Sequence, residues 1–196
     1  MEGNFLCSAP AFLFFLLLFS SYTTLVYNST DAENIKKSCA TTLYPQLCCK
    51  YLSSYSNKIK NNPKVLATSA LSITLSITRS TLQTMKNISR SGDLKPREIG
   101  AMQDCLEELN DSIDGLQKSM EEFSMSHGKD DPKFVLEMND VETWVSAALT
   151  DDNTCMDGFD ESNMNGQLKT MVRKFILRIA HLASISLTFI NHYAAQ

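Results

Sequence analysis

Six cysteines are the residues of this chain best suited to covalent chemistry, and five of them follow residue 30. Cys39 and Cys48 stand nine positions apart, whereas Cys105 and Cys155 stand fifty apart in separate helical patterns. Cysteines of an exported protein pair with one another instead of binding metal or reacting as thiols. The layout therefore indicates a helical bundle joined by disulfides. Cys39 and Cys48 would close a short loop, and one of the neighbours Cys48 and Cys49 is left as a spare thiol or an alternative partner for Cys39.

Export itself is indicated by the apolar run from Ala11 to Phe19 (AFLFFLLLF). The run is too short to span a bilayer but has the length of the core of a secretory signal. We predict a signal peptide over residues 1–30, cleaved between Ser21 and Ala32, although Glu2 is the only charged residue before the run. An uncleaved anchor is the alternative. Residues 31–196 would then form one secreted domain without stable membrane insertion.

Catalytic motifs are absent from the sequence, which has no G-x-S-x-G elbow, H-E-x-x-H pair or glycine-rich phosphate loop. The three histidines are far apart and have no cysteine or carboxylate at ligand spacing, so we expect no metal and no cofactor. They are His127, His181 and His192. Two acid pairs, Asp130-Asp131 and Asp151-Asp152, are interpreted as solvated cap or loop acids because adjacent side chains point apart. A protein that binds another protein is favoured over an enzyme.

The charge balance and the sequons fit an extracellular protein. Without residues 1–30 the chain keeps 18 Lys and Arg against 21 Asp and Glu, because Glu2 is the only charge removed. That balance includes no block of five like charges, so no nucleic-acid partner is expected. Candidate glycosylation sites are Asn28, Asn87 and Asn110.

The clearest helical pattern lies between residues 99 and 123. Apolar residues recur there in alternating steps of three and four, which is the heptad seam of a helix that packs along one stripe. The seam consists of Ile99, Met102, Leu106, Leu109, Ile113, Leu116, Met120 and Phe123. Acids and amides occupy most other positions, so the remaining surface of this helix should face water.

A second long helix is predicted to begin at Asn62 and Pro63, a cap residue followed by a proline tolerated at the first helical position. Gly92 would end it. The alternating Ser and Thr residues between 72 and 81 also fit a strand, but the sequence offers no partner strands.

Two more long helices complete the pattern. Asn139 and Glu142 form a capping box that would open one of them, with Trp144 and Cys155 facing inward. The other presents a broad apolar face between residues 168 and 190, on which Met171 is interpreted as core filler and not as the lining of a ligand cavity.

The helical segments predicted before Asn62 are shorter, because Pro45 interrupts any helix that starts near Asp31. The predicted fold is therefore all-α. An antiparallel four-helix bundle over residues 62–196 follows an N-terminal helical hairpin over residues 31–61.

Three stretches carry a resemblance to a known family. Residues 35–48 (IKKSCATTLYPQLC) resemble the opening signature of the plant pectin methylesterase and invertase inhibitor family. Residues 104–116 (DCLEELNDSIDGL) resemble its central helix, and residues 143–159 (TWVSAALTDDNTCMDGF) its most distinctive block. The similarity spans roughly residues 33–190. Two departures, an extra Cys49 and Ile185 where the family usually has Asn, leave both a monomer and a dimer open, with a monomer expected.

The resemblance implies a four-helix bundle with disulfides Cys39–Cys48 and Cys105–Cys155. It implies a secreted inhibitor that docks onto a cell-wall enzyme in the apoplast, in a 1:1 complex that covers the pectin-binding cleft. The tryptophan block resembles the pectin methylesterase inhibitors. Carried over by position, the enzyme-contacting residues are Glu107, Thr154 and Asp157.

Two alternatives remain open at this point. Pro132-Lys133-Phe134 resembles a tripeptide with which invertase inhibitors enter the invertase active site, so acid invertase is the alternative partner. That reading requires the tripeptide to project from the bundle. A non-inhibitory extracellular binding or signalling bundle is the second alternative, and it predicts a ligand-sized cavity between helices.

Overall fold

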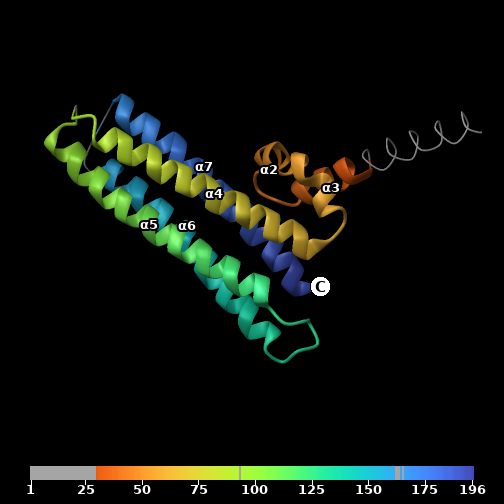
Figure 1. Cartoon of the computed structure of the whole chain (residues 1–196). Coiled ribbons are helices and arrows are strands. Elements are labelled where there is room, and N and C mark those ends of the chain that lie inside the picture. Colours follow the sequence, from red (N-terminus) through yellow and green to blue (C-terminus); the bar gives the residue numbers. More distant parts are fainter. Residues whose placement is uncertain (1–29, 93, 162–163, 165) are drawn as a thin grey trace, which may run out of the picture.

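The computed structural model describes residues 30–92, 94–161, 164 and 166–196, and every regular element in these ranges is helical. The four long helices run antiparallel as a bundle (Figure 1). Each long helix packs against two of the others, with α5 and α6 in the most extensive contact. The bounds are α4 (Pro63–Ser89), α5 (Pro96–Met125), α6 (Phe134–Glu161) and α7 (Gln167–Ala195). The predicted all-α bundle is confirmed.

An N-terminal hairpin packs across one end of α4 and α7 (Figure 1). Residues 30–40 are helical, a turn follows, and three short elements complete it: α2 (Pro45–Leu52), η1 (Ser53–Tyr55) and α3 (Ser56–Ile59). The Cys39–Cys48 disulfide links its two arms, with Cα atoms 5.5 Å apart. Ile35, Leu52 and Ile59 are at most 2% exposed, so burial of their apolar side chains holds the hairpin on the bundle. The predicted signal peptide lies outside the described residues, apart from residue 30.

The predicted ends of α4 are confirmed. The Asn62 side chain accepts a hydrogen bond from the Val65 N–H at 3.1 Å, and Pro63 is the first helical residue. At the other end Gly92 has φ of 78°, a left-handed conformation that favours glycine just after a helix. Residues 72–81 are helical throughout, so the strand alternative is wrong.

The predicted start of α6 at Asn139 is wrong, because the helix begins five residues earlier, at Phe134. Asn139 lies within the helix, where its carbonyl accepts a hydrogen bond from Thr143 Oγ1 at 2.7 Å. Phe134 is 5% exposed and packs edge-on against the Tyr193 ring, with centroids 5.8 Å apart. A tertiary contact thus extends the helix beyond the local capping signal.

The predicted seam of α5 is correct except at its start. Met102, Leu109, Leu116 and Phe123 are fully buried. Ile99, in the first turn of α5, is 42% exposed, and Met171, in the second turn of α7, is 37% exposed, so these two are not core residues. Antiparallel packing puts both turns at the same end of the bundle, where a side chain lacks neighbours on one side.

The last helix, α7, is long and apolar enough to cross a membrane by length and composition, with a mean hydropathy of 1.2 over an 18-residue window. Half of that window is buried inside the bundle. Its buried positions recur at helical spacing, so its apolar face supplies one wall of the core.

Candidate partner-binding surface

The α5–α6 pair is the part of the bundle in which two helices approach each other most closely. The Cys105–Cys155 disulfide joins them, with Cα atoms 4.3 Å apart and both side chains buried. Three turns further along α5, Gly115 faces the Trp144 carbonyl, and a Cβ on residue 115 would lie 3.0 Å from that oxygen. A covalent link and a glycine contact therefore fix these helices side by side.

The three residues expected to contact a partner all lie on this pair. Glu107 on α5 and Thr154 and Asp157 on α6 are exposed, within one turn of the two ends of the disulfide. Glu107 follows Asp104 by three residues, and Asp157 follows Thr154 by three, so each belongs to an exposed row on one side of its helix. Thr154 Oγ1 donates to the Thr150 carbonyl at 3.0 Å, which leaves its hydroxyl oxygen able to accept from a partner.

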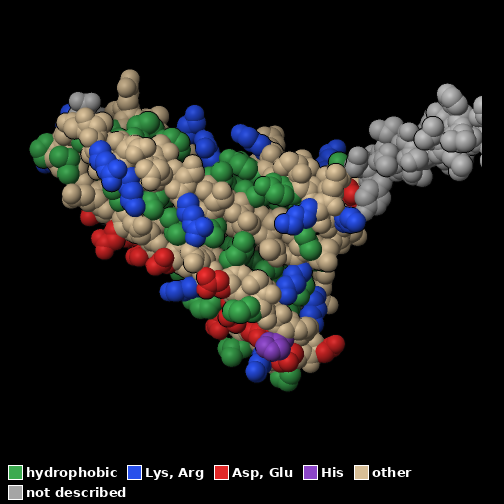
Figure 2. Space-filling view, in the orientation of Figure 1, with side chains coloured by type: hydrophobic (Ala, Val, Ile, Leu, Met, Phe, Trp, Pro, Cys, Tyr) green, Lys and Arg blue, Asp and Glu red, His purple; other side chains and the backbone are tan. Residues whose placement is uncertain are grey.

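Electrostatic coupling links other acids of the two helices across the helix seam. Partial burial, and then the charges of Glu108 and Asp111 on α5, raise the pKa of Asp151 on α6 to about 6. The pKa of Glu108 is raised as well, by burial and by Asp111 and two further acids of its own helix. Glu108 and Asp111 of α5 therefore lie near Asp151 of α6, and acids of the two helices line the seam between them. Figure 2 shows acidic side chains along the α5 margin of the molecule.

Asp152 points into the core instead of into solvent, which corrects the prediction of a solvated acid. It is 1% exposed and accepts a hydrogen bond from Ser112 Oγ of α5 at 3.2 Å. Burial holds the pKa of Asp152 well above its usual value; the Ser112 hydrogen bond lowers it and the charge of Asp151 raises it. The two adjacent acids do point apart, as predicted. Their roles differ, because one lies at the acidic surface and the other makes a polar contact beneath it.

The Pro132-Lys133-Phe134 segment does not project as a unit. Pro132 and Lys133 are exposed, but Phe134 is buried as the first residue of α6. The Lys133 N–H donates to Asp131 Oδ1 at 2.9 Å, so the segment is the N-terminal turn of a packed helix. This geometry disfavours the mode of docking that the invertase alternative requires.

The histidines take separate structural positions. His127 donates its backbone N–H to Glu137 Oε2 at 2.8 Å, and its Nδ1 lies 2.5 Å from Glu137 Oε1. Glu137 is mostly buried, and its bonds to His127 outweigh burial and lower its pKa. This contact across the α5–α6 loop was not predicted, because the partners are ten residues apart on either side of a turn. His181 stacks on Tyr44 of the hairpin, with centroids 3.7 Å apart, and burial lowers its pKa.

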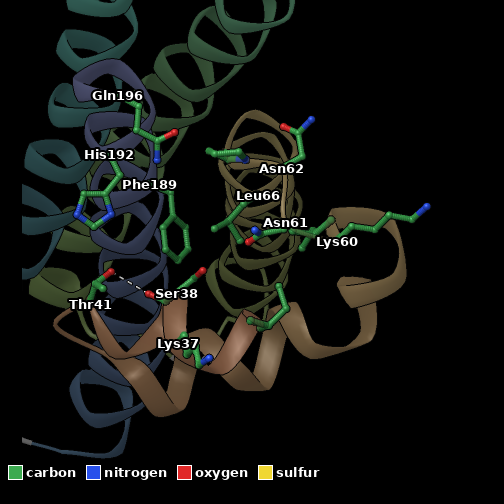
Figure 3. A pocket seen from close by; sticks show the side chains of 13 residues that line it. Lys37, Ser38, Thr41, Lys60, Asn61, Asn62, Leu66, Phe189, His192 and Gln196 are labelled. Carbon is green, nitrogen blue, oxygen red and sulfur yellow. Dashed lines mark hydrogen bonds between the residues drawn. The ribbon is translucent and has the colours of Figure 1, made fainter. Parts of the chain in front are cut away.

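A hollow of about 310 Å³ lies where the hairpin meets the ends of α4 and α7 (Figure 3). Its walls include Leu66 and Phe189, and its rim includes Lys37, Asn61 and His192. The hollow sits at an end of the bundle and not between its long helices, where a carrier bundle would hold a ligand. Within the described ranges, no group of three His, Cys, Asp or Glu side chains is placed to hold a metal ion.

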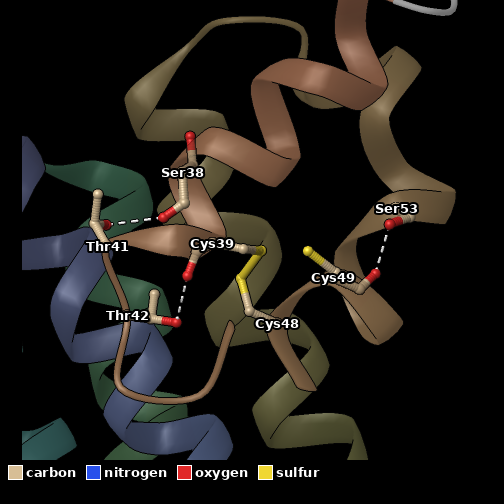
Figure 4. The surroundings of a disulfide bond; sticks show 7 residues. All are labelled: Ser38, Cys39, Thr41, Thr42, Cys48, Cys49 and Ser53. Atoms are coloured by element: carbon tan, nitrogen blue, oxygen red, sulfur yellow. Dashed lines mark hydrogen bonds between the residues drawn. A yellow bond between two sulfur atoms is a disulfide. The ribbon is translucent and has the colours of Figure 1, made fainter. Parts of the chain in front are cut away.

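Both disulfides expected from the resemblance are present, and Cys49 is free and partly buried. Figure 4 places Cys49 beside the Cys39–Cys48 bridge, with its carbonyl accepting a hydrogen bond from Ser53 Oγ. Of the sequons, Asn28 lies outside the described residues, whereas Asn87 and Asn110 are exposed on α4 and α5. The Asn110 amide donates to the Leu106 carbonyl of its own helix.

Comparison with known proteins supports the resemblance along most of the chain. The model of the plant invertase/pectin methylesterase inhibitor family matches residues 33–189. Pectinesterase inhibitor 10 of Arabidopsis thaliana is 46% identical over 168 residues, covering 86% of this chain. The chain spans about half of that relative, 53% of its length.

A second relative and a solved structure match over nearly their whole lengths. Pectinesterase inhibitor 9 of Arabidopsis thaliana is 38% identical over 191 residues, which is 93% of this chain and 94% of the relative. The crystal structure of mutant form A of a pectin methylesterase inhibitor from Arabidopsis superposes with a TM-score of 0.62 and 25% identity. The superposition covers 78% of this chain and 92% of the inhibitor chain. The chain therefore belongs to the plant invertase/pectin methylesterase inhibitor family, a family of enzyme inhibitors.

Proposed function

We propose that the protein is a secreted inhibitor of a plant pectin methylesterase in the cell wall. In this proposal the outer surface of α5 and α6 docks across the pectin-binding cleft of the enzyme in a 1:1 complex and excludes the polysaccharide. The observation that carries the proposal is the exposed position of Glu107, Thr154 and Asp157 on two helices that a disulfide holds together.

A rigid helix pair suits this role. Docking costs less conformational entropy when the binding surface is already ordered, and the Cys105–Cys155 bridge removes relative movement of α5 and α6 at the point of contact. A protein–protein interface of standard size buries about 800 Å² per partner. Two adjacent helices of 30 and 28 residues offer enough length for such an area.

The experiment is a titration of the mature, oxidised protein into a pectin methylesterase assay, with an acid invertase assay run in parallel at the same pH. We expect loss of esterase activity at one inhibitor per enzyme and no loss of invertase activity. Inhibition of invertase alone would contradict the proposal and return attention to Pro132 and Lys133. No effect on several isoforms of either enzyme would favour a non-inhibitory bundle.

Charge-neutral variants then test the proposed surface. Glu107→Gln and Asp157→Asn together should weaken esterase inhibition by at least about tenfold, equivalent to ~1.4 kcal/mol of binding free energy. Asp140→Asn is the matched control, because Asp140 is an exposed acid of α6 about four turns from Cys155. If Asp140→Asn weakened inhibition as much as the double variant does, then the overall charge of the protein, and not this surface, would determine inhibition.

A further inference from the structure

The charges of the protein are sorted between its two layers, although the net charge is small. Residues 34–92 contain nine Lys and Arg and no Asp or Glu, and residues 167–196 contain four Lys and Arg and likewise no acid. By contrast, α6 has eight acids and no Lys or Arg, and α5 has eight acids against two basic residues. The helices α4 and α7 with residues 34–59 of the hairpin therefore form one layer, here named the basic layer, opposite the acidic α5–α6 pair. The first residues of the hairpin add two acids, Asp31 and Glu33.

The basic layer presents cations that few acids neutralise. Among the described residues, Lys169 and Arg173 are its only members in an ion pair with a carboxylate on the other layer, and both pair with Asp160 of α6. Lys60 already has an interaction partner, so it is not counted among these cations. Lys174 and Arg90 are exposed, and neither forms an ion pair with a side chain that the structure describes. Figure 2 shows such basic side chains over α4 and along the upper margin of the molecule.

The cations follow a curved path around this layer. Arg79, Lys86 and Arg90 recur at steps of seven and four, so they form a row along one side of α4. That row lies toward α5, because the Arg79 guanidinium donates to Gln117 Oε1 at 2.7 Å. On α7, Lys174 and Arg178 precede His181, which stacks on the hairpin. They therefore lie toward the hairpin, on another side of the layer.

The spacing of the α4 row suits a charged polymer. At a rise of 1.5 Å per residue, Arg79 and Lys86 are about 10 Å apart along the helix, and Lys86 and Arg90 about 6 Å. These separations are comparable with the screening length at physiological salt, about 8 Å, so their attractions for one polyanion add. Neutral hydrogen-bonding side chains lie between them on the exposed side of α4, namely Ser80 and Gln83. Such groups can bind hydroxyl groups of a sugar chain.

We propose that the basic layer binds de-esterified pectin, a linear polymer of sugar carboxylates. A flexible polyanion can follow cations around a curved surface, whereas a flat membrane or a rigid protein would meet only one side of the layer. This inference rests on the proposed function in one respect: a pectin methylesterase hydrolyses methyl esters and leaves carboxylates on the polymer. The inhibitor would then be retained where its target enzyme has already acted, with the acidic surface free for the enzyme.

The test measures binding of the oxidised protein to immobilised polygalacturonate and to fully methyl-esterified pectin over a range of salt concentrations. We expect binding to polygalacturonate that weakens steadily as salt rises, because the polyanion releases counterions on binding, and little binding to the ester. The triple variant Arg79→Gln, Lys86→Gln, Arg90→Gln should bind at least about fivefold more weakly and with a smaller salt slope.

A matched triple variant removes the same charge from elsewhere. Arg97→Gln, Lys118→Gln and Lys133→Gln neutralise three exposed cations of α5 and its following loop, and should change polygalacturonate binding by less than about twofold. Equal losses in the two triple variants, or equal binding to the ester, would overturn the inference. A salt-sensitive dimer that forms without polymer and disappears in the α4 variant would also overturn it, because a second copy would then occupy the layer.

Complex formation with the esterase, measured by gel filtration without polymer, separates this inference from the proposed function. The α4 triple variant should form the complex as the unaltered protein does. A protein that binds the enzyme but not polygalacturonate contradicts only the inference. One that binds polygalacturonate but no esterase contradicts only the proposed function.

Discussion

Helices α5 and α6 are joined covalently, whereas α4 and α7 are held together by packing and a buried hydroxyl contact. In the first pair, Cys105–Cys155 and the close approach at Gly115 fix the helices, and a buried acid, Asp152, lies between them. In the second pair, Thr74 Oγ1 and Ser186 Oγ lie 2.9 Å apart inside an apolar interface. The charges differ too, being mainly acidic on the first pair and basic on the second.

One bundle thus combines a covalently fixed helix pair with a pair held by ordinary core packing. The α5–α6 pair contains groups that burial disfavours, and its acids repel one another across the seam. A disulfide offsets such costs by restricting the unfolded chain. Within the described residues, the α4–α7 pair has no disulfide of its own. We infer that α5 and α6, whose acids repel one another, form the surface that binds the partner.

Removal of the second disulfide should have the largest effect. In the loop-entropy model, closing 50 residues stabilises by about 4 kcal/mol and closing nine by about 2.5 kcal/mol. Cys105→Ala with Cys155→Ala should therefore lower the free energy of unfolding in urea more than Cys39→Ala with Cys48→Ala. Esterase inhibition should also fall more in the first double variant. Equal losses in stability and inhibition would remove the distinction between the bridges.

The two buried serines provide a direct comparison of the helix pairs. Ser112→Ala leaves the Asp152 carboxyl buried without its partner, and should cost about 1–3 kcal/mol. Ser186→Ala leaves Thr74 Oγ1 still bonded to the Ala70 carbonyl, and should cost about 1 kcal/mol or less. Urea denaturation of both variants measures the difference, and a costlier Ser186→Ala would reverse the comparison.

The close approach at Gly115 can be tested with a second glycine on the same helix. Gly100→Ala meets no atom within 4 Å and should stabilise by about 0.5–1 kcal/mol, because alanine is the better helix former. Gly115→Ala gains the same propensity but presses a methyl group against the Trp144 carbonyl, and should destabilise by about 1 kcal/mol. A stabilising Gly115→Ala would mean that α6 moves away at little cost.

The smallest predicted effect depends on pH. The pKa of Asp151 is raised to about 6, so the folded protein holds this proton more tightly than the unfolded chain. The corresponding stability is present below an ordinary aspartate pKa, near 4, and is lost as the pH rises through about 6. Asp151→Asn should therefore raise the melting temperature more at pH 7 than at pH 4. Asp140→Asn controls for removal of one α6 carboxylate, and the same pH dependence in both variants would contradict the assignment.

Periodicity predicted the long helices well because their seams are built from local repeats. From Met102 to Phe123 the heptad residues are buried as expected, apart from the partly buried Leu106 and Met120. Asn62 caps α4 as its position indicates. The errors occur where a distant residue decides the outcome. Phe134 begins α6 because Tyr193 packs against it, and Ile99 is exposed because the bundle ends beside it.

The placement of the three candidate residues on exposed helix surface was predictable, but the residues around them were not. The family resemblance placed Glu107, Thr154 and Asp157 on two helices, and all three are exposed. The coupling of Asp151 to Glu108 and Asp111 crosses helices, so no spacing within one helix reveals it. The small net charge likewise gave no sign of the basic layer. Nucleic acid was excluded as a partner because no basic surface was expected, so the basic layer removes the reason for that exclusion, which stays a prediction.

The most direct test of the docking surface is chemical footprinting of the complex with a pectin methylesterase. Carbodiimide labelling reports the exposure of Glu107 and Asp157, and acylation reports that of Lys86 and Lys174 on the basic layer. We expect the two carboxyl groups to lose reactivity in the complex and both lysines to keep theirs. Protected lysines with unchanged carboxyl reactivity would contradict it, because the enzyme would then bind the opposite layer.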